Sequence, residues 1–224
     1  MKKGIVIFDL TDTLVNTTAV WIEAYKSLIK ELNIEINRIE SDILRSGGPE
    51  KALEALMDFH RVPYTHTELA IKLGSYAIAD FDNDAILMPG AVEGVMAMHD
   101  QGYSVATIAN TNPALTEMAR KKFGKLLQID KWYNTRNLGL SKDNNRLYEI
   151  IAEDFSMDKS KCVLIDNSEP VIKAVSKMGI KTIFLSDYPI KEADRTIKSL
   201  HDLCLSKESK RPTSSFIFTE SLLF

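Results

Sequence analysis

The sequence lacks the features that mark secreted, membrane-spanning and nucleic-acid-binding proteins. It has two cysteines in 224 residues, too few for a disulfide framework, and no apolar run near the ~20 residues that a membrane-spanning helix requires. Its formal net charge of −3 gives no basic surface for nucleic acid. No small-residue cleavage site follows the basic N-terminus, so we expect no signal peptide. These absences favour a globular cytoplasmic protein that binds neither nucleic acid nor a membrane.

Cysteine and histidine do not indicate a metal site. Cys162 lies in an apolar segment and Cys204 in a predicted late helix, without metal-ligand spacing, and we interpret both as packing residues. The histidines are scattered and are assigned no chemistry: His60, His66, His99 and His201.

Apolar segments followed by helical periodicity occur along most of the chain. Strands are predicted at residues 4–8, 103–109, 163–165, 182–185 and, more weakly, 132–134. Helical spacing of apolar side chains follows several of them, as at Val171, Val175 and Met178. This alternation predicts an α/β fold with a doubly wound parallel sheet.

Residues 16–86 have a different pattern, without a convincing strand. Apolar spacing predicts helices around residues 22–32, 36–44, 53–59 and 69–78, the second of them closed by Gly47-Gly48-Pro49. About 70 residues exceed what a crossover connection needs. We therefore predict an all-helical cap domain at 16–86, inserted into an α/β core made of residues 1–15 and 87–205.

The tail at 206–224 is of uncertain structure. It begins with a polar, basic stretch and ends in the apolar groups 216–218 and 222–224. Such an ending is poorly suited to water. We expect the tail to pack on the core or on a second subunit, so the sequence leaves an oligomer possible.

Polar residues follow the predicted strands where each strand ends. Asp9 follows the first strand, Asn110 and Thr111 follow the second, and Asp166 follows residues 163–165, while Lys142 precedes a predicted helix. In a doubly wound sheet the carboxyl ends of neighbouring strands form one ligand-binding edge, where these side chains can meet. A carboxylate there can act as a covalent nucleophile, although an isolated Asp is more often a turn former or a helix cap.

This ordered set resembles the motifs of the haloacid dehalogenase superfamily, whose members are mostly phosphatases. The first motif of that family often reads Phe-Asp-Leu-Asp-Gly-Thr-Leu, and residues 8–14 here read Phe-Asp-Leu-Thr-Asp-Thr-Leu. Lys142 and Asp166 stand where the third and fourth motifs have their lysine and first acid. The resemblance extends to about residue 205 and implies a Rossmann-like core with a helical cap of the C1 type.

The resemblance also implies roles for the matching residues. Asp9 would attack a phosphoryl group to form an aspartyl-phosphate, Lys142 would neutralise charge, and Asn110 would hydrogen-bond a phosphoryl oxygen. Mg²⁺ would be held by Asp9, Asp166 and the backbone carbonyl of Thr11.

Three departures from the family pattern leave catalysis open. Thr11 replaces a second Asp that serves as general acid and base, a contribution worth ~10²–10⁴-fold; P-type ATPases of the same superfamily also carry Thr there. Ala109 replaces a phosphate-binding Ser or Thr, for which Thr111 can substitute only if the strand ends differently. Pro170 and Val171 stand where the fourth motif usually has another acid.

Two neighbouring acids have alternative interpretations. Asp12 can substitute as the acid and base or can cap a helix, and it occupies the position where the family has Gly. Glu169 can reach a metal-bound water or can cap the helix that follows it.

The predicted cap contains one candidate substrate-binding loop, at residues 45–51. Its glycines permit close backbone approach, and Arg45 and Lys51 can hold an anionic substrate. The alternative is an ordinary helix–helix turn with solvated charges. A phosphonate-cleaving relative uses a cap lysine near this point as a Schiff base. Lys51 is therefore also a candidate Schiff-base lysine.

Three functions follow from these residues. The leading hypothesis is a Mg²⁺-dependent hydrolase of a small phosphorylated metabolite, acting through an aspartyl-phosphate on Asp9. The second is a catalytically weakened relative that binds a phosphorylated ligand or a protein partner, as Thr11, Ala109 and Pro170 suggest. The third is a phosphonate-cleaving enzyme.

Overall fold

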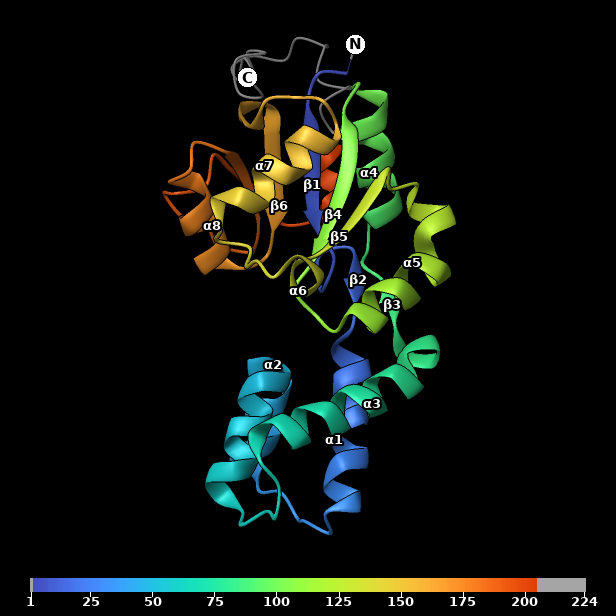
Figure 1. Ribbon diagram of the computed structural model, residues 1–224, viewed down its shortest axis with the longest axis vertical. Coiled ribbons are helices and arrows are strands. Elements are labelled where there is room, and N and C mark those ends of the chain that lie inside the picture. The colour runs from blue at the N-terminus through green and yellow to red at the C-terminus, as the bar shows by residue number, and fades with distance from the viewer. Residues whose placement is uncertain (1, 205–224) are drawn as a thin grey trace, which may run out of the picture.

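The computed structural model describes residues 2–204, without the side chains of residues 44–47; the predicted tail therefore lies outside the described residues. A parallel six-stranded sheet forms the centre, in the order β5-β4-β1-β6-β7-β8 (Figure 1). Its strands are β1 Ile5–Asp9, β4 Ser104–Ala109, β5 Lys131–Asn134, β6 Cys162–Asp166, β7 Lys181–Leu185 and β8 Arg195–Ile197. The doubly wound fold class is confirmed. β8 was not predicted, because three residues with one buried side chain give no apolar run.

Helices cover both faces of the sheet because strand side chains alternate between the faces. Val6 and Phe8 of β1 pack in one apolar cluster with α4 and α5, whereas Ile5 and Ile7 pack in the other with α7 and α8. These helices are α4 Ala91–Asp100, α5 Pro113–Leu127, α7 Asn145–Asp154 and α8 Glu169–Ser176. Short helices are α6 Thr135–Leu138 and the 3₁₀ turns η1 Lys159–Lys161 and η2 Leu200–Leu203.

Both cysteines are free thiols, and Cys162 belongs to a buried apolar cluster of the core. Cys162 begins β6 and is fully buried, and Cys204 follows η2 and is half-buried. Burial raises the pKa of the Cys162 thiol to about 12 and also raises that of Cys204. A raised thiol pKa disfavours the reactive thiolate, which agrees with a packing role.

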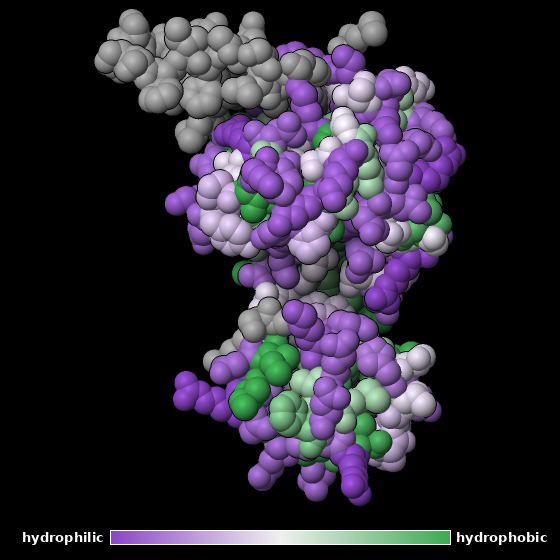
Figure 2. Space-filling model, turned by 90° about the vertical axis from the view of Figure 1, so that its left-hand side faces the viewer, coloured by the Kyte–Doolittle hydropathy of each residue, from purple (hydrophilic) through white to green (hydrophobic). Residues whose placement is uncertain are grey.

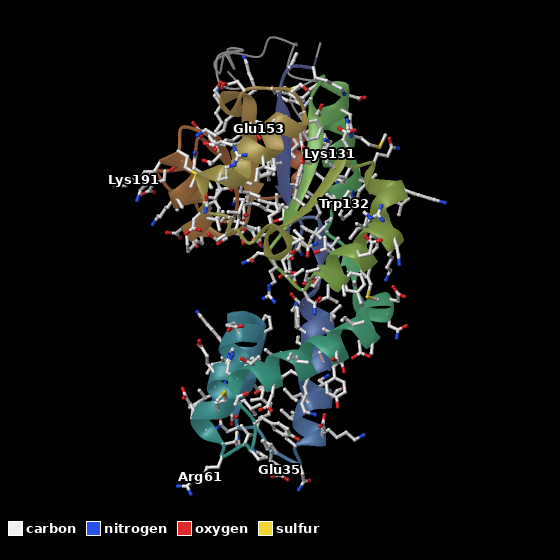
Figure 3. The ribbon with its side chains drawn as sticks, in the orientation of Figure 1. Glu35, Arg61, Lys131, Trp132, Glu153 and Lys191 are labelled. Carbon is white, nitrogen blue, oxygen red and sulfur yellow. The ribbon has the colours of Figure 1, made fainter. Side chains whose placement is uncertain are left out.

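Three helices, α1 Thr18–Glu31, α2 Arg38–Phe59 and α3 His66–Asp84, lie between β2 Val15–Asn16 and β3 Ile86–Leu87. β2 and β3 pair antiparallel, so the chain enters and leaves this helical insert at one short ribbon. Figure 1 shows the insert beyond the carboxyl ends of the strands, and Figure 2 shows a narrower waist between the two parts. Figure 3 places Glu35 and Arg61 at the end of the insert farthest from the sheet.

The predicted break at Gly47-Gly48-Pro49 separates two helical segments of α2. Gly48 has φ 74° and ψ 178°, outside the helical region, so Arg38–Phe59 consists of two helices joined at a kink. Glycine adopts a positive φ without the steric cost of a Cβ, which allows the helix to change direction there. The candidate substrate-binding loop is thus part of α2.

The helical insert is attached to the core at the end of α3. Lys122 of α5 donates from Nζ to the carbonyl oxygens of Asp82 and Ala85, at 2.6 and 2.8 Å. These carbonyls belong to the last turn of α3 and to its C-cap, where a cation also favours the helix dipole. Within residues 2–204 no helix is long and apolar enough to cross a membrane.

Candidate active site

Asp9 lies at the centre of the carboxyl edge of the sheet. It is the last residue of β1, which runs between β4 and β6. Its side chain is almost fully buried, and Thr13 donates from Oγ1 to its Oδ2 at 3.1 Å. The other oxygen, Oδ1, accepts a hydrogen bond from Lys142. The strand and these two donors hold the carboxylate in one orientation.

Lys142 joins the two buried carboxylates of the site. Its Nζ donates to Oδ1 of Asp9 at 2.5 Å and to Oδ2 of Asp166 at 2.9 Å. α7 holds the backbone of Lys142, because the buried hydroxyl of Tyr148 on that helix donates to the Lys142 carbonyl oxygen at 2.8 Å. Three residues that are far apart in sequence thus form one compact cluster.

Burial and charge together set the ionisation of this cluster. Burial raises the pKa of Asp9; the Lys142 ammonium opposes this shift, and the charge of Asp166 adds to it. Burial alone would lower the pKa of Lys142, but attraction by Asp9 and Asp166 outweighs it and the pKa is raised. Lys142 is therefore a permanent cation at neutral pH.

The loops that carry these residues are bonded to one another. The backbone amide of Ser168 donates to Oδ1 of Asp166 at 2.8 Å, which fixes the fully buried carboxylate. The Asn167 side-chain amide donates to the Asp12 carbonyl oxygen at 3.2 Å. The segments after β1 and after β6 are therefore held side by side.

Asp12 is hydrogen-bonded to the residue that precedes α1. Its Oδ1 accepts from the backbone amide of Thr17 at 2.9 Å and from the Thr17 hydroxyl at 3.3 Å. Thr17 is the N-cap residue of α1 and has no side-chain cap bond, so Asp12 holds the N-cap residue and does not cap the helix itself. The Asp12 φ of 59° lies in the left-handed region, where Gly, Asn and Asp are the favoured residues, which explains how Asp can stand where the family has Gly.

A polar hollow of about 260 Å³ opens beside Lys142. The other residues that line it come from the end of β4, the Lys142 loop and the start of α8: Asn110, Ser141, Asp143, Ser168, Pro170 and Val171. Asn110 and Lys142 thus line the same hollow. Every lining residue belongs to the α/β core.

Thr11 and Thr111 lie in a different environment. Both line a small, mainly apolar hollow between the core and the helical insert, together with Trp21 and Phe81. β4 ends at Ala109, as the sequence predicts, and the Ala109 side chain is fully buried. Thr111 therefore does not line the hollow beside Lys142, and the missing hydroxyl at Ala109 is not replaced from that position.

Of the two predicted substrate contacts from the cap, only the Lys51 side chain is among the described residues, and it does not line this hollow. Lys51 is exposed on α2 and lines neither hollow, and the Arg45 side chain lies outside the described residues. Glu169 is engaged elsewhere: one carboxylate oxygen pairs with Lys173 at 2.6 Å and the other accepts from the Tyr188 hydroxyl at 3.2 Å.

The buried carboxylates of Asp9 and Asp166 are the oxygen ligands in this site that could hold a magnesium ion. Among residues 2–204 no group of three or more His, Cys, Asp and Glu side chains could hold a metal ion by itself. Mg²⁺ commonly takes one or two carboxylates and completes its shell with water and phosphate oxygens. Asp9 and Asp166 supply two buried carboxylates against the one cation of Lys142, so a further positive charge would be stabilised there.

Several supporting residues were not identified from the sequence. Thr13 lies inside the first motif, so its position beside Asp9 had a local signal. Asn134, Thr135 and Asn167 had none, because each acts through a contact to a residue distant in sequence. Tyr148 contacts Lys142 only six residues away, but no motif marks that contact.

Several solved structures have the same fold as this chain. The chain matches a predicted phosphoglycolate phosphatase from Haemophilus somnus with a TM-score of 0.75 and 18% identity, covering 91% of this chain and 97% of that one. It matches CbbY from Rhodobacter sphaeroides in complex with phosphate with a TM-score of 0.70 and 17% identity, covering 91% and 96%. A third match, at TM-score 0.71 and 16% identity, covers 91% and 97% and is YfnB from Bacillus subtilis bound to magnesium.

A family model gives independent evidence from the sequence. The model described as haloacid dehalogenase-like hydrolase matches residues 6–185, a span that contains Asp9, Lys142 and Asp166 as well as the helical insert. Fold and sequence therefore agree, and the chain belongs to the family of haloacid dehalogenase-like hydrolases.

Proposed function

We propose that this protein is a Mg²⁺-dependent phosphatase of a small phosphorylated metabolite and that Asp9 is its nucleophile. The observation that carries the proposal is the cluster at the carboxyl edge of the sheet, where Lys142 contacts both Asp9 and Asp166 beside an open polar hollow. The volume of about 260 Å³ is below the roughly 300–1,000 Å³ of sites for drug-sized ligands. It suits a phosphoryl group with little else attached.

In the first step an Asp9 oxygen attacks phosphorus, and the bond between phosphorus and the ester oxygen breaks as the aspartyl-phosphate forms. Lys142 stabilises the charge that develops on the phosphoryl oxygens, and Asn110 donates a hydrogen bond to one of them. In the second step water attacks the phosphorus, which releases phosphate and restores the Asp9 carboxylate.

Asp9, Asp166 and the Thr11 carbonyl would hold the magnesium ion. When bound, Mg²⁺ supplies positive charge that offsets the repulsion between the carboxylate and the dianionic phosphoryl group. Magnesium bound to YfnB and phosphate bound to CbbY support the assignment of both ligands to this site.

The absence of an acid at Thr11 determines which esters react. A hydroxyl does not protonate the leaving oxygen at neutral pH, and Asp12 is engaged by the start of α1. The leaving oxygen must therefore take its proton from water, so phosphate esters with acidic leaving groups are expected to react fastest.

The test is release of phosphate from p-nitrophenyl phosphate in the presence of Mg²⁺. We expect wild-type turnover to fall to background in Asp9→Asn and on removal of metal with EDTA. Asp12→Asn is the matched control: it keeps the shape and the tolerance for positive φ, so most activity should remain. Equal rates for wild type and Asp9→Asn would exclude the aspartyl-phosphate route.

The specific alternative is a weakened relative that binds a phosphorylated ligand without turnover. Thr11, Ala109 and Pro170 favour it, because each removes a group that assists the reaction in the family. It predicts no turnover of any ester but a rise in Tm with inorganic phosphate and Mg²⁺. A phosphonate-cleaving activity through Lys51 has less support, since Lys51 is exposed and lines neither hollow.

A further inference from the structure

Asn110 is exposed at the edge of the hollow beside Lys142. The terminal torsion of asparagine is broad, so an exposed amide can present either its oxygen or its nitrogen to a ligand. An oxygen facing a phosphoryl group would repel it, whereas the nitrogen would donate a hydrogen bond. Some contact must select between these orientations if Asn110 is to bind phosphate.

A fully buried threonine provides that contact. The Thr135 hydroxyl donates from Oγ1 to Oδ1 of Asn110 at 2.8 Å. With its oxygen engaged by Thr135, the Asn110 amide presents its NH₂ group away from that contact. Thr135 is β-branched and buried, so its own rotamer is restricted and the contact is rigid.

Strand register explains why these residues meet. Ala109 of β4 pairs with Asn134 of β5, so the next residues, Asn110 and Thr135, leave the sheet next to one another. Asn134 strengthens this corner: its Nδ2 donates to the Thr111 carbonyl at 3.1 Å and to the Thr116 hydroxyl at 2.7 Å. Its Oδ1 accepts from the Arg136 amide at 3.0 Å, which fixes the start of α6.

We infer that Thr135 is a positioning residue of the phosphoryl site and acts by orienting the Asn110 amide so that it donates to a phosphoryl oxygen. This inference rests on the proposed function. It also gives a role to the β5–α6 corner, which contributes no side chain to the lining of the hollow. Because Ala109 has no hydroxyl, Asn110 is the neutral donor that the end of β4 supplies.

The test compares Thr135→Val, which keeps the shape and removes the hydroxyl, with Thr135→Ser, which keeps the hydroxyl. The probe is inorganic phosphate with Mg²⁺, measured by calorimetry, together with KM and kcat for p-nitrophenyl phosphate. We expect Thr135→Val to weaken phosphate binding and raise KM by about 2- to 10-fold, the effect of one hydrogen bond. Thr135→Ser should bind phosphate like the wild type.

A double-mutant cycle with Asn110→Ala separates positioning from a general loss of structure. If Thr135 acts through Asn110, Thr135→Val has no further effect on phosphate binding in the Asn110→Ala background. Thr182→Val is the matched control, because Thr182 is also fully buried and its hydroxyl contacts Asp194, at the opposite end of the sheet. It should leave phosphate binding unchanged.

Two results overturn the inference while leaving the proposed function intact: unchanged phosphate binding in Thr135→Val, or an equal loss with and without Asn110. A wild-type protein that neither binds phosphate nor hydrolyses the ester overturns the proposed function itself, and the positioning role with it.

Discussion

At the scale of single residues, the site is defined by two buried carboxylates that share a single ammonium group. Asp9 and Asp166 are buried with one ammonium between them, an arrangement that is costly unless further positive charge arrives. The same arrangement is useful in a phosphotransfer site, where a cation and a ligand are recruited together. Thr11 is the residue whose identity most affects the chemistry, because it stands where the family has an acid.

Replacing Thr11 by aspartate should restore the general acid. We expect Thr11→Asp to raise kcat for an alkyl phosphate by about 10²-fold or more, with a smaller gain for p-nitrophenyl phosphate, whose leaving group needs little protonation. The ratio of the two rates is the measurement. A gain of the same size for both esters would show that the new carboxylate does not act as an acid.

At the scale of elements, α2 depends on an acid inside the helical insert. Glu40 is almost fully buried and accepts from the Asn37 backbone amide at 2.9 Å, while Asn37 Oδ1 accepts from the Glu40 amide at 3.1 Å. The other Glu40 oxygen lies 2.7 Å from Nε2 of His60, which is the C-cap residue of α2. The contact between Glu40 and His60 therefore links the first turn of α2 to its C-cap across the kink.

Glu40→Ala should lower the free energy of unfolding by about 2–3 kcal/mol, because it removes a capping box and leaves His60 without its partner. Chemical denaturation measures the change. Glu68→Ala is the control, since Glu68 completes the equivalent capping box at Thr65 on α3 but is exposed. An equal loss in the two variants would mean that the buried contact to His60 contributes nothing.

At the scale of the whole molecule, the helical insert and the core share one apolar cluster. Val20, Leu28 and Phe81 of the insert belong to the same buried cluster as Phe8 and Leu115 of the core. The insert nevertheless contributes no residue to the hollow beside Lys142. The polar attachment through Lys122 lies at the junction of the two parts, where it restrains the end of α3.

Lys122→Met should loosen this junction. We expect a loss of about 1 kcal/mol in stability, from two hydrogen bonds and a helix-terminal charge, and faster amide hydrogen exchange at the end of α3. Lys121→Met, on the same helix and equally exposed, should change neither quantity. Unchanged exchange at the end of α3 in Lys122→Met would show that packing alone holds the insert to the core.

Much of the core could be predicted because its signals are local. Apolar runs and helical periodicity identified five of the six strands, and the motif around Asp9 with Lys142 and Asp166 indicated the family. β8 and the β2–β3 ribbon were missed, because two or three residues carry no periodicity. The break at Gly48 and the helices on either side of it were predicted, because the Gly-Gly-Pro signal and the apolar spacing are both local.

The sequence by itself determined the succession of the longer strands and helices, the two carboxylates at strand ends, Asp9 and Asp166, and the lysine of the family motif, Lys142. It could do so because hydrophobic patterning and motif spacing are properties of neighbouring residues. The tertiary structure decided what no spacing encodes: that Lys142 contacts both carboxylates, that Thr135 contacts Asn110, and that Lys51 does not line the hollow. Each of these depends on sheet register and helix packing between segments that are distant in the chain.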